Sequence, residues 1–377
     1  MPTLLSSLSS NYTSKRENHP SQNNEMKRLL IVLHNLKNGG VERVLSVLAN
    51  YFAGKEYDVH ILAISSDEVS YPLSPDVKYE YVPIIPIYKR MGLFGNLRSV
   101  GKIFKQIKRI NPDYVIGFDD SIIIRSIPSA WLLRKKIIVS ERIDPSIYGL
   151  PMHIVRQICY DMADHVVFQT DDARAYFPKR TQKKSVVIPN PLSEGLPYRN
   201  KETNKDIIMA CRLRPQKNVG LAIRAFAQFY KTHPDYRLVV FGEGYQLEEL
   251  KALAAEKGVE NSVLFPGHVD DIHQRMASCA MFLMSSDYEG LSNSMIEALA
   301  IGAPTISTDC PVGGARMMIN NGENGLLVPV GDEQAITNAM GKIADDKELS
   351  SRLSTNGTKI RERLSVTTIC PQWEALL

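Results

Sequence analysis

The 377-residue sequence predicts an α/β protein made of two successive domains with a cleft between them. Apolar, strand-like runs alternate with helix-like segments along the chain, which is typical of parallel sheets covered by helices. The alternation stops at a polar segment near residues 191–206 and then begins again. The composition, 44% hydrophobic and 23% charged, is that of an ordinary soluble globular protein, and the length allows two separate cores.

The first alternation follows a tail. Residues 1–26 are rich in Ser and Asn, and we expect them to be disordered. The expected first domain covers residues 27–190. It begins with a buried strand at 28–33, a turn at Asn38-Gly-Gly40 and a helix at 41–52. Its later strands are expected at 59–64, 114–118, 137–140, 165–169 and 186–188.

Residues 191–206 form the expected linker, and residues 207–364 the second domain. Its strands are expected at 207–210, 238–241, 263–265, 281–284, 305–307 and 326–328, and its helices at 219–231, 246–257, 293–301 and 333–344. Residues 365–377 are expected to form a C-terminal helix that can cross back to the first domain. Ligands of such sheets bind at the carboxyl ends of the strands, so we expect the site between the domains.

Charge and cysteine content narrow the class of protein. Residues 1–190 hold 26 Lys and Arg against 18 Asp and Glu, whereas residues 191–377 hold 19 against 23, so the first half favours an anionic partner. The five cysteines are scattered without a Cys-x-x-Cys pair, which favours a reducing cytoplasm over a disulfide scaffold or a zinc site. No apolar run approaches the roughly 20 residues that span a bilayer.

Glu289 and Glu297 bracket the most informative segment. Glu289 follows the apolar run 280–286, and Glu297 lies about one turn inside a helix that begins near Ser292 or Asn293, both good N-cap residues. A helix N-terminus that points into a cleft is a site for phosphate. A carboxylate on that helix can accept hydrogen bonds from a ribose diol. Two solvated glutamates at a helix start are the alternative interpretation.

Cationic residues and glycines follow other predicted strands. Arg212 and Lys217 flank a short loop after the first strand of the second domain, where they can neutralise a leaving pyrophosphate. Gly39-Gly40 and Gly242-Glu-Gly244 also follow strands, so their backbone can approach a ligand closely. Each feature alone is compatible with surface cations and simple tight turns. Their joint order and spacing favours one binding site.

Together these features resemble the retaining glycosyltransferases of family 4 type (glycosyl transferases group 1), which have the GT-B fold of two facing Rossmann-like domains. The resemblance covers about residues 27–377 and is more specific in the second domain. The segments 140–145 and 309–314 are similar to members that build bacterial surface polysaccharides or lipid-linked oligosaccharides. The matching elements are Asn38-Gly-Gly40, Ile188-Pro-Asn190, Arg212 with Lys217-Asn218, Gly242-Glu-Gly244, Pro266-Gly-His-Val269, the Glu289/Glu297 pair, Glu297 to Pro304 and Asn321 to Pro329.

The resemblance implies the catalytic residues Arg212, Lys217 and Glu289. Arg212 and Lys217 would neutralise the donor diphosphate, and Glu289 would orient the donor sugar and phosphate. When the anomeric bond breaks, negative charge develops on the nucleotide, so preorganised cations there should provide the largest catalytic term.

The resemblance also implies donor-binding residues. Glu297 would accept from the ribose hydroxyls, His268 and Val269 would meet the base, and Gly40 would close over the diphosphate from the first domain. Backbone N–H groups of the 291–293 segment would reach the sugar or the β-phosphate. The donor-binding set is Gly39, Gly40, Arg142, Gly242, His268, Val269, Leu291, Ser292, Asn293 and Glu297.

The family is thought to retain anomeric configuration by a front-face route, in which the departing phosphate helps to deprotonate the acceptor. Many members carry a histidine after the strand that matches 137–140, whereas this chain has Glu141-Arg142 there. Arg142 is therefore expected to contact sugar or phosphate. His34 is expected to be structural. No cofactor and no metal are expected, because Asp119-Asp120 and Asp270-Asp271 lack the Asp-x-Asp form.

The acceptor side is predicted from residues 97–110. Apolar residues recur there at helical spacing, Lys and Arg occupy most other positions, and no acidic residue falls between Val82 and Pro112. Such a helix can lie on an anionic membrane surface. A helix packed on the core with a solvated basic face is the alternative. Because similar family members use lipid-linked acceptors, we expect a cytoplasmic enzyme that is peripheral on the inner face of the plasma membrane.

We therefore predict a metal-independent glycosyltransferase that moves a hexose or N-acetylhexosamine from a nucleotide sugar, expected to be UDP-linked, to a lipid-linked or polysaccharide acceptor in surface glycan biosynthesis. The alternatives are a sugar-nucleotide epimerase on the same scaffold and an inactive carbohydrate-binding or scaffold protein. A nicotinamide dehydrogenase is disfavoured because Asn38-Gly-Gly40 lacks the Gly-x-Gly-x-x-Gly pattern. Nucleic acid is not an expected partner, because the basic helix has no aromatic residue beyond Phe104.

Overall fold

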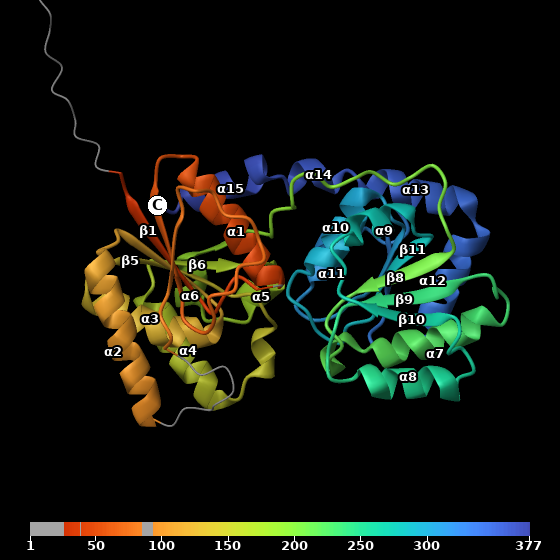
Figure 1. Ribbon diagram of the computed structural model, residues 1–377, viewed down its shortest axis with the longest axis horizontal. Coiled ribbons are helices and arrows are strands. Elements are labelled where there is room, and N and C mark those ends of the chain that lie inside the picture. The colour runs from red at the N-terminus through yellow and green to blue at the C-terminus, as the bar shows by residue number, and fades with distance from the viewer. Residues whose placement is uncertain (1–25, 38, 85–92) are drawn as a thin grey trace, which may run out of the picture.

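Two α/β domains lie side by side in the computed structural model, which describes residues 26–37, 39–84 and 93–377 (Figure 1). The predicted pair of Rossmann-like domains is confirmed. The predicted tail at 1–26 lies outside the described residues except for Met26, and so does Asn38 of the Asn-Gly-Gly turn.

The first domain is built on a parallel sheet in the order β3-β2-β1-β4-β5-β6-β7. β1 lies inside the sheet between β2 and β4, and its residues Leu29 to Val32 are completely buried because helices cover both faces of the sheet. The strands are β1 (Arg28–Leu33), β2 (Asp58–Ala63), β3 (Lys78–Tyr81), β4 (Tyr114–Phe118), β5 (Lys136–Ser140), β6 (His165–Phe168) and β7 (Ser185–Val187).

The second domain repeats this plan with a parallel sheet in the order β10-β9-β8-β11-β12-β13. The order reverses between β8 and β11, which is where parallel α/β sheets open a crevice for ligands. The strands are β8 (Asp206–Ala210), β9 (Arg237–Phe241), β10 (Val263–Gly267), β11 (Met281–Met284), β12 (Thr305–Thr308) and β13 (Leu326–Val328).

The helices pack apolar faces onto the two sheets. In α10, for example, every residue from Met295 to Ile301 is buried, so this short helix is held at a fixed angle by its neighbours. The α-helices are α1 (Gly40–Ala53), α2 (Leu93–Ile110), α3 (Asp120–Leu132), α4 (Leu150–Met162), α5 (Asp171–Ala175), α6 (Lys179–Lys183), α7 (Val219–Tyr230), α8 (Leu247–Glu256), α9 (Ile272–Ser278), α10 (Asn293–Ile301), α11 (Gly314–Met318), α12 (Glu333–Asp345), α13 (Lys347–Gly357), α14 (Ile360–Arg363) and α15 (Val366–Glu374). Two 3₁₀ turns, η1 (Pro145–Ile147) and η2 (Pro215–Lys217), complete the described elements.

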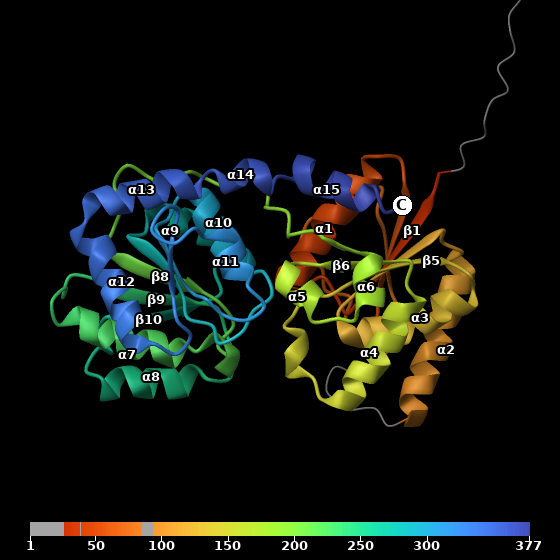
Figure 2. The ribbon, with the colours of Figure 1, turned by 180° about the vertical axis from the view of Figure 1, so that it is seen from behind.

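The chain crosses between the domains twice. Residues 188–205 connect β7 to β8 without a helix or strand, and α14 and α15 return along the top of the molecule (Figure 2). The last helix docks firmly on the first domain. Trp373 is completely buried and stacks on Phe118 with 5.4 Å between ring centroids, and Tyr51 donates to Glu374 at 2.7 Å.

Helix α2 has the core-packed arrangement given above as the alternative interpretation. Ile103, Ile107 and Ile110 are buried in the first domain's core, and α2 packs against α3. The apolar face is therefore unavailable for insertion into a bilayer, whereas Lys105 and Lys108 remain exposed.

Candidate active site in the interdomain cleft

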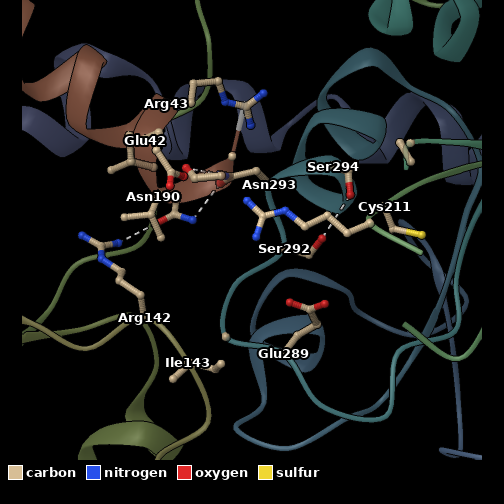
Figure 3. Close-up of a pocket in the computed structure, with 18 of the residues that line it drawn as sticks. Glu42, Arg43, Arg142, Ile143, Asn190, Cys211, Glu289, Ser292, Asn293 and Ser294 are labelled. Atoms are coloured by element: carbon tan, nitrogen blue, oxygen red, sulfur yellow. Dashed lines mark hydrogen bonds between the residues drawn. The ribbon is translucent and has the colours of Figure 1, made fainter. Parts of the chain in front are cut away.

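A cavity of about 1000 Å³ lies between the domains at the carboxyl ends of their central strands. Both sequence halves line it, as the close-up in Figure 3 shows for part of the wall. All of the residues predicted to be catalytic or donor-binding line this cavity, so the fold brings the whole predicted set together. They are Gly39, Gly40, Arg142, Arg212, Lys217, Gly242, His268, Val269, Glu289, Leu291, Ser292, Asn293 and Glu297.

Lys217 and Glu289 form an ion pair on the wall that belongs to the second domain. Both are largely shielded, with side chains 20% and 13% exposed, and the Ser286 hydroxyl also donates to Glu289 at 3.2 Å. The loop that carries Lys217 is held from behind, because Ser285 donates to the Lys217 and Asn218 carbonyls at 2.9 and 3.0 Å. The lysine charge is thus fixed in place before any ligand arrives.

Arg212 extends across the cleft toward the Gly-Gly turn of the first domain. A Cβ placed on Gly39 would lie only 2.9 Å from the Arg212 guanidinium and would also collide with the Glu42 carboxylate. A side chain at position 39 would therefore displace the arginine. Burial raises the pKa of Glu42, although the Arg212 charge opposes that rise.

The glycines after β9 serve the packing of the site as well as its surface. A Cβ on Gly242, whose φ is +120°, would lie 2.1 Å from the Cys211 carbonyl oxygen, and one on Gly244 would lie 2.1 Å from that of Leu213. Only glycine lets this turn fit beneath the loop that carries Arg212. At these two glycines the backbone therefore comes close to the backbone of Cys211 and Leu213 in the same chain, in addition to any approach to a ligand.

The N-terminus of α10 opens onto the cavity beside the N-terminus of α1. Ser292 caps α10 by accepting from Met295 N–H at 3.5 Å, and Asn293 donates across the gap to the Gly40 carbonyl at 2.8 Å. Two helix N-termini directed at one space create a positive potential there. This arrangement favours a phosphate.

Asn190 connects the two walls. Its side-chain oxygen accepts from Arg142 at 2.6 Å, and its side-chain nitrogen donates to Asn293 at 2.7 Å (Figure 3). Nearby, the Leu291 N–H donates to Gln169 of the first domain at 3.2 Å. Of the backbone N–H groups predicted to reach the donor, that of Leu291 is therefore already occupied in this structure.

Glu297 is buried beneath the cavity and is engaged by groups from both domains. Arg43 of α1 forms an ion pair with one carboxylate oxygen, and His273 Nε2 lies 3.2 Å from the other. Burial alone would raise the pKa of Glu297, but the charges of Arg43 and His273 outweigh it and hold the pKa below its ordinary value. A ribose hydroxyl that donates to Glu297 would share the carboxylate with Arg43 and His273.

Arg142 is partly buried on the wall that belongs to the first domain. Its guanidinium lies over the rings of Phe118 and Trp373, 4.6 and 5.5 Å from their centroids. Burial lowers the pKa of Arg142 to about 9, so the group stays cationic at neutral pH. Its Nε and Nη2 are buried without a hydrogen-bond partner among the described residues.

His268 and Val269 occupy the rim of the cavity, where His268 is about half exposed and lies 3.7 Å from Asp270. His34 also lines the cavity. Both of its ring nitrogens have hydroxyl partners, Ser65 at 2.7 Å and Ser121 at 2.5 Å.

A buried charge cluster forms the floor of the cavity on the side of the first domain. Arg156 of α4 is completely inaccessible and pairs with Asp120 at 2.6 Å and with Glu141. Its guanidinium lies 4.6 Å from the centroid of Tyr148, which lines the cavity together with both carboxylates. One guanidinium faces two carboxylates, so the cluster is not fully neutralised by Arg156, and burial raises the pKa of Asp120. Asp120 and Glu141 both contribute to the lining of the cavity.

The sequence analysis did not identify Arg43, Asn190, Arg156 or Gln169 as parts of the site. Arg43 follows the Gly-Gly turn by one helical turn, and Asn190 ends the Ile-Pro-Asn motif, so position relative to those motifs is a signal for these two. Nothing in the local sequence marks Arg156. It lies on an ordinary amphipathic helix, and only the fold brings it under Asp120 and Glu141.

No group of three or more His, Cys, Asp or Glu side chains in 26–37, 39–84 and 93–377 is arranged to hold a metal ion. Within the same part of the chain, no helix has the length and hydrophobicity required to cross a bilayer.

Comparison with known protein families covers most of the chain. The family described as Glycosyltransferase Family 4 matches residues 38–194, and the family described as Glycosyl transferases group 1 matches residues 197–360. The two matches meet at the crossing between the domains, so each describes one wall of the cleft.

Individual relatives and a solved structure are also similar to this chain. The N-acetylgalactosamine-N,N'-diacetylbacillosaminyl-diphospho-undecaprenol 4-alpha-N-acetylgalactosaminyltransferase of Campylobacter jejuni is 27% identical over 348 residues, covering 86% of this chain and 92% of that protein. The exopolysaccharide phosphotransferase SCO2592 of Streptomyces coelicolor is 33% identical over 220 residues, covering 56% of this chain and only 23% of that much longer protein. Anabaena HepE in complex with UDP and glucose superposes with a TM-score of 0.80 at 20% identity, covering 93% of this chain and 98% of HepE.

Proposed function

This chain belongs to the glycosyltransferases of group 1 and family 4, and on that premise we propose that it is a retaining enzyme that transfers a hexose or N-acetylhexosamine from a UDP-sugar to a lipid-linked glycan. One observation carries the proposal: Arg212, Lys217 and the N-terminus of α10 meet in a single interdomain cavity. The combination of two cations with a helix N-terminus suits a diphosphate leaving group.

The donor would lie along the wall formed by the second domain. Its diphosphate would contact Arg212 and Lys217, its ribose would approach Glu297, and its base would reach the rim at His268 and Val269. As the anomeric bond breaks, the electron pair leaves with the diphosphate oxygen. The two cations would stabilise that developing charge, because preorganised charge at a leaving group is effective in catalysis.

The acceptor would enter from the wall formed by the first domain. Asp120, Glu141 and Tyr148 offer oxygens that can accept from or donate to sugar hydroxyls. A lipid-linked acceptor is supported by the Campylobacter relative, whose name specifies a diphospho-undecaprenol glycan. A UDP-linked donor is supported by HepE, whose crystal structure is a complex with UDP and glucose.

Retention is proposed from the resemblance to retaining family members, and a front-face route is proposed because the Glu289 carboxylate is already engaged by Lys217 and by the Ser286 hydroxyl. It is therefore poorly placed to act as a separate nucleophile. The departing phosphate, close to the cations, would instead take the acceptor proton on the same face of the sugar. Arg212 and Lys217 supply the charge that a divalent cation provides in other enzymes, so the proposed reaction requires no metal.

The proposal is tested by incubating the purified protein with UDP-[¹⁴C]glucose, UDP-[¹⁴C]N-acetylglucosamine or UDP-[¹⁴C]N-acetylgalactosamine and an undecaprenyl-diphosphate-linked sugar. We expect label in the lipid fraction with one donor, an α-linkage by proton NMR, and an unchanged rate in EDTA. Transfer with inversion, or transfer abolished by EDTA and restored by a cation, would contradict the proposed mechanism. Conversion of the donor to its epimer without any acceptor would favour a sugar-nucleotide epimerase instead.

A further inference from the structure

Exposed apolar side chains are concentrated on one face of α4. Leu150, Ile154 and Ile158 recur every four residues and are 73%, 53% and 50% exposed, and Val155 borders the same surface. Residues at this spacing lie above one another on one side of a helix. We call the surface formed by Leu150, Ile154, Val155 and Ile158 the α4 stripe. A contiguous apolar patch of this kind marks a surface that contacts another body.

Basic side chains flank the α4 stripe on both sides. On one side, α6 is joined to α4 by a hydrogen bond of 2.8 Å from Gln157 to Thr181, and it exposes Lys179 and Lys183. On the other side, α3 separates α4 from α2, which exposes Lys102, Lys105 and Lys108. The strand order with right-handed crossovers places α2, α3 and α4 on the same face of the sheet.

Acidic residues are nearly absent from this face. The sequence has none at 82–112 or 145–160, and Asp161 at the end of α4 is paired with Arg180 at 2.9 Å. Both ribbon views place α2 and α4 at the same lower end of the first domain (Figures 1 and 2). An apolar strip bordered by unpaired cations is complementary to a bilayer with anionic headgroups. A second copy of this chain would bring like charges together.

The opposite side of α4 is fixed to the floor of the cleft. Arg156 projects away from the α4 stripe into its buried pairs with Asp120 and Glu141, and Tyr148 lies just before the helix begins. A membrane bound at the stripe would therefore be held at a constant distance from the acceptor side of the cavity. This geometry suits a substrate whose lipid stays in the bilayer while its sugar enters the cleft.

We propose that the α4 stripe, with its flanking cations, is the surface by which this protein docks on an anionic membrane. This deepens the proposed function, on whose lipid-linked acceptor it rests, and it relocates the predicted contact. The apolar part is supplied by α4, and α2 contributes only its basic face, since Ile103 and Ile107 of α2 are buried in the core. The stripe enters the interfacial region of the bilayer without spanning it.

The test is co-sedimentation of the full chain with mixed phosphatidylcholine–phosphatidylglycerol vesicles. Replacing Ile154→Gln and Ile158→Gln together should lower the vesicle partition coefficient at least about tenfold, because two half-exposed side chains can no longer be buried. The matched control is Leu264→Gln with Val330→Gln, which removes two similarly exposed apolar side chains from the second domain and should bind like the wild type. Replacing Lys102, Lys105 and Lys108 by Gln should weaken binding to these vesicles and reduce its salt dependence.

Gel filtration of the same variants separates the membrane from a partner copy. If the stripe substitutions convert a dimer to a monomer without changing vesicle binding, the α4 stripe is a contact between copies and the proposal is wrong. Wild-type protein that stays in the supernatant, or stripe and control variants that bind equally, would also overturn it. These assays contain no sugar nucleotide. A negative result would therefore contradict the membrane contact without testing the transfer reaction, which the labelled-donor assay tests separately.

Discussion

Replacing Lys217 by Ala is expected to reduce turnover at least about tenfold, which corresponds to roughly 1.4 kcal/mol of barrier. Lys217 supplies a fixed positive charge next to Glu289, where the diphosphate would gain negative charge as the glycosidic bond breaks. Removing one preorganised group that stabilises a developing charge typically costs about 10²–10³ in turnover. Initial rates with saturating donor and acceptor measure the effect.

A control is required because the substitution also leaves Glu289 without its cation. Lys251→Ala removes another lysine of the second domain that pairs with a glutamate, Glu248 at 2.9 Å, on the exposed surface of α8. It should leave turnover unchanged. The Lys217→Ala protein should keep its far-UV circular dichroism spectrum. If Lys217→Ala turns over at nearly the wild-type rate, Lys217 has no part in the mechanism.

Replacing Glu297 by Gln is expected to raise the KM for the donor about tenfold, because a charge-assisted hydrogen bond to the ribose is replaced by a weaker neutral one. The same change should lower the free energy of unfolding by roughly 2–4 kcal/mol, because it leaves Arg43 beside a neutral group. Steady-state kinetics and denaturant titration measure the two effects separately. Glu333→Gln, which removes the charge from an exposed pair with Arg224, should change neither quantity appreciably.

The pH dependence of stability provides a second test of the role of Glu297. Because the folded-state pKa of Glu297 is lowered, the stability from its ion pair is fully present above its ordinary pKa of 4.5 and is lost as the pH falls through the folded value. The wild type should therefore lose more stability than Glu297→Gln when the pH is lowered from neutrality to below 4.5. Equal losses in the two proteins, or an unchanged donor KM in Glu297→Gln, would show that the carboxylate is not used as described.

Much of the fold could be predicted from the sequence because apolar runs report buried parallel strands directly. The strand β1 and the helix α10, for instance, have the same bounds in the sequence analysis and in the structure. The edge strand β3 was missed. Its sequence Lys78-Tyr-Glu-Tyr81 is polar and only partly buried, so it carries no apolar run. Pairing with β2 decides its conformation, and local sequence does not encode that contact.

The site residues can likewise be divided into those that could be predicted from the sequence and those that could not. Residues that belong to short motifs, such as Gly242, Lys217 and Glu289, could be predicted because each motif ends a strand, and the carboxyl ends of parallel strands meet. Contacts between the domains could not be predicted from the sequence. The pair of Arg43 with Glu297 joins residues 254 positions apart, and its formation depends on the angle between two rigid bodies. Helix α2 shows a further limit, since an amphipathic pattern is the same whether its apolar face meets a core or a membrane.

The most direct test of the account is a thermal-shift measurement with UDP-, GDP- and ADP-sugars on the wild type and on Arg212→Ala. A nucleotide sugar at about 100 times its dissociation constant should stabilise the wild type by roughly 2.7 kcal/mol, by mass action. We predict that one nucleotide class, UDP, raises the melting temperature of the wild type and that Arg212→Ala loses most of this shift. A protein that none of the nucleotides stabilises, or an equal shift in both proteins, would contradict the claim that Arg212 and its neighbours hold the donor in the cleft.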